Sequence, residues 1–119
     1  MLNCFVVAFG GGLGACARYL IGLVPIKEPF SFPIKTLFIN FLGCFVIGLI
    51  VVLAEKESSI SPKTVLFIKT GLCGGFTTFS TFALETETLI KTGRIGMAAL
   101  YVSLSVFVGI ALVFVAGKL

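Results

Sequence analysis

The chain has 119 residues, of which 58% are hydrophobic and only 12% are charged, and its mean hydropathy is +1.17. A soluble domain of this length has too much surface for its volume to hide so many apolar side chains, so the composition excludes a soluble globular fold. The net charge is +4 and the chain has no histidine, and we expect neither an enzyme nor a nucleic-acid-binding protein.

Four apolar stretches are each long enough to cross a bilayer as a helix, which takes roughly 20 residues. They run from about Leu2 to Val24, Thr36 to Ala54, Thr64 to Ile90 and Ile95 to Gly117. The first lacks the basic start of a secretory signal and is followed by three more spans, so we expect a membrane helix there. We therefore predict an all-α membrane protein in which residues 1–119 form a single four-helix transmembrane domain.

The first span contains GGGLGACARY, from Gly10 to Tyr19. Gly10 and Gly14 are four residues apart, a spacing of small residues that lets helices approach closely in lipid. Arg18 lies near the end of this span, where a charged side chain is costly. Two interpretations of Arg18 stay open: an interfacial anchor beside Tyr19, or a charge that attracts an anion or fixes a subunit interface.

Three short connections separate the spans. The first, PIKEPFSFP from Pro25 to Pro33, has three prolines and predicts an extended loop. In the second, Ser61 and Pro62 suit a helix N-cap followed by proline at the first helical position. In the third, Gly93 is placed to end a helix.

The third span contains GLCGGFTTFSTF, from Gly71 to Phe82, and is longer than one straight crossing needs. Gly74 and Gly75 lie well inside it, and glycine weakens a helix by roughly 1 kcal/mol relative to alanine. We predict a break in the helix at this pair. A break would free backbone carbonyls in the protein interior, and such hard oxygen atoms suit a small structural cation.

Aromatic and hydroxyl side chains follow the glycine pair. Phe76, Phe79 and Phe82 share one broad helix face, and the hydroxyls alongside belong to Thr77, Ser80 and Thr81. Ring edges are electropositive and hydroxyls are neutral donors, so this strip suits a small anion that must bind reversibly. Ordinary helix packing, with each hydroxyl bonded to the preceding turn, is an equally open interpretation.

Other spans add neutral donors that can face this strip. Asn40 lies in the second span, and Tyr101 and Ser105 lie four residues apart on one face of the fourth. Glu85 and Glu87 lie near the far end of the third span, where we expect a solvated or capped helix end.

Lysine and arginine are almost evenly divided between the two sides of the predicted membrane domain. The side with both termini carries Lys56, Lys63 and Lys118, with Lys69 slightly inside the third span, and the other carries Lys27, Lys35, Lys91 and Arg94, with Arg18 near the end of the first span. The bias that normally sets orientation is therefore almost absent. A chain without a preferred orientation can insert both ways, which permits an antiparallel homodimer.

The motifs resemble the Fluc (CrcB) family of fluoride channels over essentially the whole chain. The matching stretches are GGGLGACARY, Asn40 followed by FLG, GLCGGFTTFSTF, and GRIG after the third span. The resemblance implies an antiparallel, dual-topology homodimer with a broken third helix, two fluoride pores and a structural Na⁺ at the dimer centre. It implies that backbone carbonyls of Gly74 and Thr77 from each subunit coordinate the Na⁺.

The resemblance also assigns the pore residues. The family's pore phenylalanines match Phe79 and Phe82, its pore asparagine matches Asn40, and the hydroxyls of its polar track match Ser80, Thr81, Tyr101 and Ser105. Its first-span arginine matches Arg18, with a role near the vestibule or the dimer contact. The chain departs from some members at Gly109, where they carry a further serine.

The implied function is passive export of fluoride through the bacterial cell membrane, which would protect the cell from fluoride toxicity. One rival is a small dual-topology multidrug exporter driven by protons, which needs an intramembrane carboxylate. The first and second apolar stretches contain no Asp or Glu, which disfavours it. The other rival is a membrane scaffold whose glycines and hydroxyls serve helix packing alone. We rank the channel above both.

Overall fold

The structure, a computed structural model of the chain, describes residues 1–28 and 32–119. Residues 29–31, which belong to the loop predicted from Pro25 to Pro33, lie outside the described residues. All the regular secondary structure of the described part is helical. Three helical passages in it are long and apolar enough to cross a membrane: Leu2–Gly22, Ile34–Lys56 and Ile95–Gly117.

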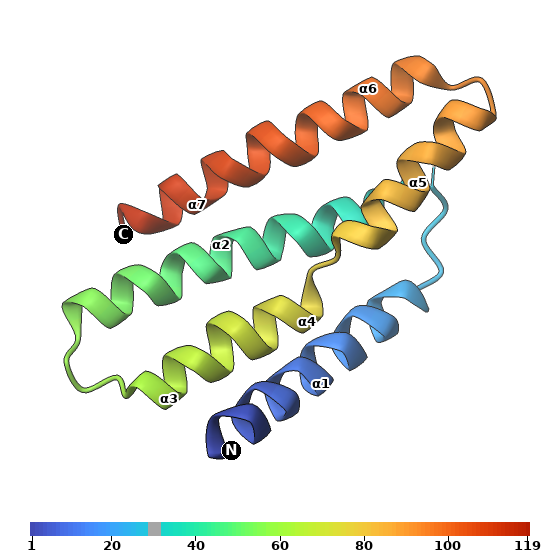
Figure 1. Cartoon of the computed structure of the whole chain (residues 1–119). Helices are drawn as coiled ribbons and strands as arrows, with labels where there is room; N and C mark the ends of the chain where they lie inside the picture. Colours follow the sequence, from blue (N-terminus) through green and yellow to red (C-terminus); the bar gives the residue numbers. More distant parts are fainter. Residues whose placement is uncertain (29–31) are drawn as a thin grey trace.

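The helices form four passages, close to the predicted ranges. The first two are α1 (Leu2–Gly22) and α2 (Ile34–Lys56). The third consists of α3 (Pro62–Val65), the π-helical segment η2 (Leu66–Cys73), α4 (Gly74–Phe76) and α5 (Phe79–Lys91). The fourth consists of α6 (Ile95–Ser103), the π-helical segment η3 (Leu104–Val108) and α7 (Gly109–Gly117). Figure 1 shows both termini and the α2–α3 connection toward one end of the bundle, and the α5–α6 turn at the other.

The predicted helix ends at Ser61 and Gly93 are confirmed. The Ser61 hydroxyl accepts a hydrogen bond from the Thr64 N–H at 3.2 Å, and Pro62 occupies the first position of α3. Gly93 has a φ of +81°, which a glycine adopts without strain. This turn lets the N–H of Arg94 donate to the carbonyl of Leu89 at 2.8 Å, which closes the end of α5.

Helix α1 packs tightly on η2 and α4 through its glycines, as the small-residue spacing predicts. Gly10 and Gly14 are the buried residues of α1. A Cβ atom on Gly10 would lie only 2.7 Å from the carbonyl oxygen of Phe67, and one on Gly14 would overlap the carbonyl oxygen of Leu72. The close approach therefore depends on glycine at these two positions, because glycine has no Cβ atom.

The third passage leaves the helical path at Thr77 and Thr78, and the prediction of a break at the glycine pair is wrong in position. Gly74 has helical angles (φ −62°, ψ −39°), and both glycines belong to α4. Thr77 (φ −82°, ψ 159°) and Thr78 (φ −149°, ψ 119°) are extended. Gly75 serves packing instead, because a Cβ atom there would overlap the backbone of Gly11 on α1.

Candidate functional site

The side-chain amide of Asn40 on α2 meets the backbone of Thr78, in the extended stretch between α4 and α5. The Thr78 N–H donates to Asn40 Oδ1 at 2.9 Å, and Asn40 Nδ2 donates to the Thr78 carbonyl at 3.2 Å. In a continuous helix this N–H would donate to the carbonyl of Gly74. Asn40 therefore satisfies backbone groups that would be costly to leave unpaired away from water.

The extended stretch also frees carbonyl groups. The Gly74 carbonyl loses its helical donor, because the Thr78 N–H turns to Asn40. The Thr77 carbonyl also loses its helical donor, because the Thr81 N–H donates to the Thr78 hydroxyl at 3.2 Å. Thr78 is thereby the N-cap of α5. Gly74 and Thr77 are the two residues predicted to bind sodium, and carbonyl oxygens are suitable ligands for that ion.

A groove with a cavity volume of about 370 Å³ runs along this stretch. Its lining brings together residues that are far apart in the sequence, from α2, η2, α4, α5 and η3. Six of the predicted site residues are among them: Asn40, Gly74, Thr77, Phe79, Phe82 and Ser105. We call this hollow the central groove.

Ser105 contributes an unpaired donor to the central groove. Its Oγ is the one buried side-chain polar atom without a hydrogen-bond partner in residues 1–28 and 32–119. A buried hydroxyl left in this state costs about 1–3 kcal/mol, so its retention suggests a partner such as an ion or water. Ser105 lies in η3, and η2 lines the same groove through Lys69 and Cys73. Such π-helical segments are rare and are often found at functional sites.

Two phenylalanine rings connect the central groove to a buried tyrosine. Phe79 lines the groove with 78% of its surface exposed, and its ring centroid lies 5.7 Å from that of Phe82. The Phe82 ring lies in turn 5.1 Å from the ring of Tyr101, which is fully buried. The two phenylalanines thus share one face of α5, as their spacing predicts.

The Tyr101 hydroxyl turns to Glu85. It donates to Glu85 Oε1 at 2.9 Å, and the Thr36 hydroxyl donates to Glu85 Oε2 at 3.0 Å. The expectation of a solvated end is therefore wrong for Glu85, which is half-buried and bonded to two other passages. A signal for this was present in the sequence, since Glu85 lies three residues after Phe82 and four before the buried Leu89, on the same helix face.

Residues 5–117 match the family described as CrcB-like protein, Camphor Resistance (CrcB). The chain belongs to this CrcB-like family. Relatives named "Fluoride-specific ion channel FluC" include one from Methylobacillus flagellatus, 44% identical over 100% of this chain and 94% of the relative. One from Flavobacterium psychrophilum is 46% identical over 92% of this chain and 90% of the relative, and one from Chlorobium chlorochromatii is 48% identical over 81% and 74%.

The match confirms the resemblance drawn from the motifs, and the CrcB-like chain is a multi-pass protein of the bacterial membrane, as its span-length apolar helices predict. Gly109, where the resemblance implies a serine in some family members, is buried, and a Cβ atom there would lie 3.4 Å from Cys44 Sγ. The Gly109 position in this CrcB-like protein therefore packs against α2.

Four predicted site residues lie outside the lining of the central groove of this CrcB-like protein: the buried Tyr101 described above, and Ser80, Thr81 and Arg18. Ser80 is exposed, with its hydroxyl 3.5 Å from that of Thr78, and Thr81 is half-buried on α5. Arg18 reaches from α1 to α4, where its Nε donates to the carbonyl of Gly75 at 3.2 Å. Arg18 thereby supplies a donor to another carbonyl next to the extended stretch.

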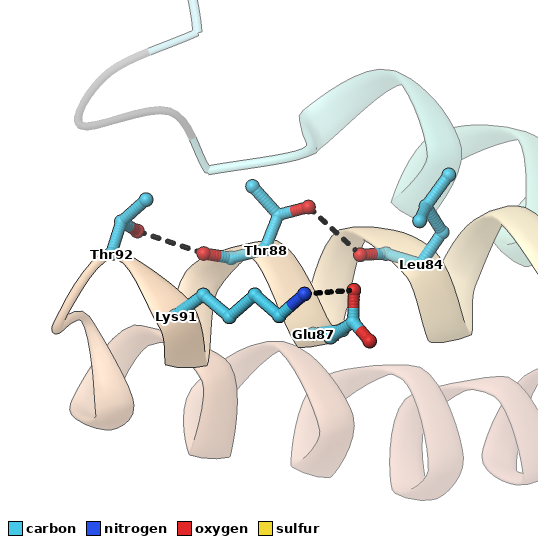
Figure 2. Close-up of polar contacts among 5 residues, drawn as sticks. All are labelled: Leu84, Glu87, Thr88, Lys91 and Thr92. Atoms are coloured by element: carbon cyan, nitrogen blue, oxygen red, sulfur yellow. Dashed lines mark hydrogen bonds and ion pairs between the residues drawn. The ribbon is translucent and has the colours of Figure 1, made fainter.

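Glu87 behaves differently from Glu85 and fits the predicted solvated helix end. It is exposed and pairs with Lys91 one turn later on α5, at 3.4 Å (Figure 2). On the same part of the helix, the hydroxyls of Thr88 and Thr92 bond back to the carbonyls of Leu84 and Thr88, at 3.0 Å and 2.9 Å. These threonines satisfy their hydroxyls within α5.

Proposed function

We propose that the protein is a fluoride-selective channel through which F⁻ leaves the cell passively, down its electrochemical gradient, so that the cell is protected from fluoride toxicity. The observation that carries this proposal is the likeness, at 44% identity over the full chain, to a relative named as a fluoride-specific ion channel. Conduction of this kind makes and breaks no covalent bond.

The central groove supports an anion path by its chemistry. The ring edges of Phe79 and Phe82 are weakly electropositive, and the unpaired hydroxyl of Ser105 is a neutral donor. The Asn40 amide nitrogen has two protons, and its bond to Thr78 uses only one. We propose that these donors replace part of the hydration shell of F⁻ without holding it tightly, as conduction requires.

We propose that two copies assemble as an antiparallel, dual-topology homodimer with two pores. The central groove is an open hollow of one subunit, and a pore needs a closed wall around it. Phe79 is largely exposed on the groove, as expected for a ring that a second copy would cover. The near-even division of lysine and arginine between the two sides agrees with insertion in both orientations.

We propose a structural Na⁺ at the dimer centre, held by the carbonyl oxygens of Gly74 and Thr77 from each subunit. The two residues fit such an ion, because both carbonyls have lost their helical donors and both residues line the central groove. An ion bound there would supply the positive charge that offsets the partial negative charge of these carbonyl oxygens. Exchange of Na⁺ for a large organic cation should lower the melting temperature of the purified dimer, and an unchanged value would argue against the site.

The channel function is tested by ion efflux from liposomes that contain the purified protein and valinomycin, with no proton gradient. Fluoride-loaded vesicles should empty quickly, and chloride-loaded vesicles should retain their anion. Retention of fluoride by vesicles with folded protein would contradict the channel. Dye-cation uptake driven by an imposed pH gradient would instead indicate the proton-coupled exporter.

A further inference from the structure

Lys69 is a cation that follows Pro62, the first residue of the third passage, by seven positions, and it is exposed in the subunit. It lies in η2, about 10 Å along the helix from Pro62, where α3 begins, and at a similar distance from the extended Thr77. A charged side chain at such a depth is costly in lipid and is normally found facing a water-filled cavity or a partner. Lys69 lines the central groove and is the charged residue on its lining in the described part of the chain.

A second hollow, of about 320 Å³, adjoins the central groove. It is lined by α2 between Ile47 and Glu55 and by α7 at Val113 and Gly117. Ile47 and Lys69 line both hollows, so the two are neighbours that meet at these residues. Together the two hollows extend from the Asn40–Thr78 pair to Glu55 in the last turn of α2 and Gly117 at the end of α7, and Lys69 lines both.

Glu55 is the opposing charge on this hollow, and its position differs from that of Lys69. It lies in the last turn of α2 beside Lys56. Glu55, Lys56 and Lys69 are all exposed in the subunit, but of the three only Lys69 also lines the central groove. Charges at such an outer position are screened by solvent and salt, whereas a charge in a cleft with apolar walls acts more strongly on a passing ion. An anion that enters from this end therefore meets the effective positive charge at Lys69.

On the basis of the channel function proposed above, we infer that Lys69 is the electrostatic entry residue of the pore. Its ammonium raises the concentration of fluoride at the inner end of the second hollow, from which the ion passes to the neutral donors of Asn40 and Ser105. Lys69 thus sets the rate of entry at low fluoride, while the neutral part of the central groove selects the ion.

The test compares fluoride efflux from liposomes, at one subsaturating fluoride concentration, for the wild type and four variants. Lys69→Met and Lys69→Gln remove the charge, Lys69→Arg keeps it, and Lys63→Met removes a charge from the same passage outside both hollows. Each variant is first checked for elution at the position of the wild-type assembly. Efflux is measured with an impermeant salt at ionic strengths of about 10 mM and about 1 M, between which the screening length falls from about 30 Å to about 3 Å.

We expect Lys69→Met and Lys69→Gln to conduct about three- to tenfold more slowly than the wild type at low ionic strength, and within about twofold of it at high ionic strength. Lys69→Arg and Lys63→Met should stay close to the wild type under both conditions.

Equal rates for the neutral Lys69 variants and the wild type at low ionic strength would overturn the inference and leave the channel intact. An equal loss at both ionic strengths, or in Lys63→Met, would also overturn it. A wild type that passes no fluoride would remove the channel function, and the inference with it.

Discussion

Asn40 holds the backbone of Thr78 from both ends of its amide, accepting from the N–H at 2.9 Å and donating to the carbonyl at 3.2 Å. The two residues are 38 positions apart, on α2 and between α4 and α5. One side chain thus stabilises the place where the third passage is extended, and the same side chain lines the central groove. Both the extended stretch at Thr78 and the proposed conduction of fluoride therefore depend on the side-chain amide of Asn40.

Replacement of Asn40 by leucine should destabilise the fold and abolish fluoride efflux together. The change leaves two backbone groups without partners, which should lower the free energy of unfolding by about 2–5 kcal/mol. Denaturant unfolding in detergent, beside liposome efflux, measures both effects. Asn3→Leu, at an exposed position near the start of α1, serves as the control. Unchanged stability of Asn40→Leu would show that the amide is not a structural clamp.

Replacement of Ser105 by alanine should slow fluoride efflux without loss of stability. The hydroxyl has no partner within the described residues, so its removal takes away a desolvation cost rather than a bond. We expect efflux to fall about tenfold and the melting temperature to stay the same or rise. Ser103→Ala, two residues away at an exposed position outside the groove lining, should leave both unchanged. A less stable Ser105→Ala that conducts normally would point to a packing role.

Replacement of Phe79 by alanine separates the channel from the scaffold. Phe79 is 78% exposed in the subunit and lines the central groove, so its removal should reduce efflux by about tenfold or more. Phe107 on η3 is comparably exposed, at 72%, and lies outside the groove lining, which makes Phe107→Ala a matched control. The scaffold hypothesis predicts the reverse for Phe79, a change in stability with no effect on flux.

Replacement by alanine should have different effects on stability at two glycines of α1. A Cβ atom on Gly10 would lie 2.7 Å from the Phe67 carbonyl oxygen, so Gly10→Ala should destabilise the protein by about 1–3 kcal/mol through overpacking. Gly12 has nothing within 4 Å of such an atom, and Gly12→Ala should be neutral or stabilising by up to about 1 kcal/mol. Thermal unfolding of both variants checks this. Equal effects would mean that α1 does not pack on η2 through Gly10.

Replacement of Tyr101 by phenylalanine should destabilise the protein by about 1–3 kcal/mol, because the half-buried Glu85 loses one of its two donors. The ring and its contact with Phe82 are kept, so the loss reports the hydrogen bond. Tyr19→Phe is the control, since Tyr19 is 66% exposed. If the two variants unfolded at the same temperature, the Tyr101–Glu85 bond would contribute nothing to stability.

The sequence alone determined the parts of this protein that depend on neighbouring residues. The four passages follow from runs of apolar residues of bilayer length, and their observed ends lie close to the predicted ones. The helix ends at Ser61 and Gly93 follow from local capping chemistry. The close approach of α1 follows from the spacing of Gly10 and Gly14, because a small residue permits contact with whatever backbone lies opposite.

Only the tertiary structure decided where the third passage becomes extended and which partners the polar side chains find. Gly74 and Gly75 have the weakest helix preference locally, yet they stay helical, because Gly75 packs on Gly11 and the Thr78 N–H finds Asn40. Glu85 joins Thr36 across 49 positions of sequence. Away from water, these polar groups find their hydrogen-bond partners on another passage. The residues next to a polar group in the sequence do not show which passage packs against that group.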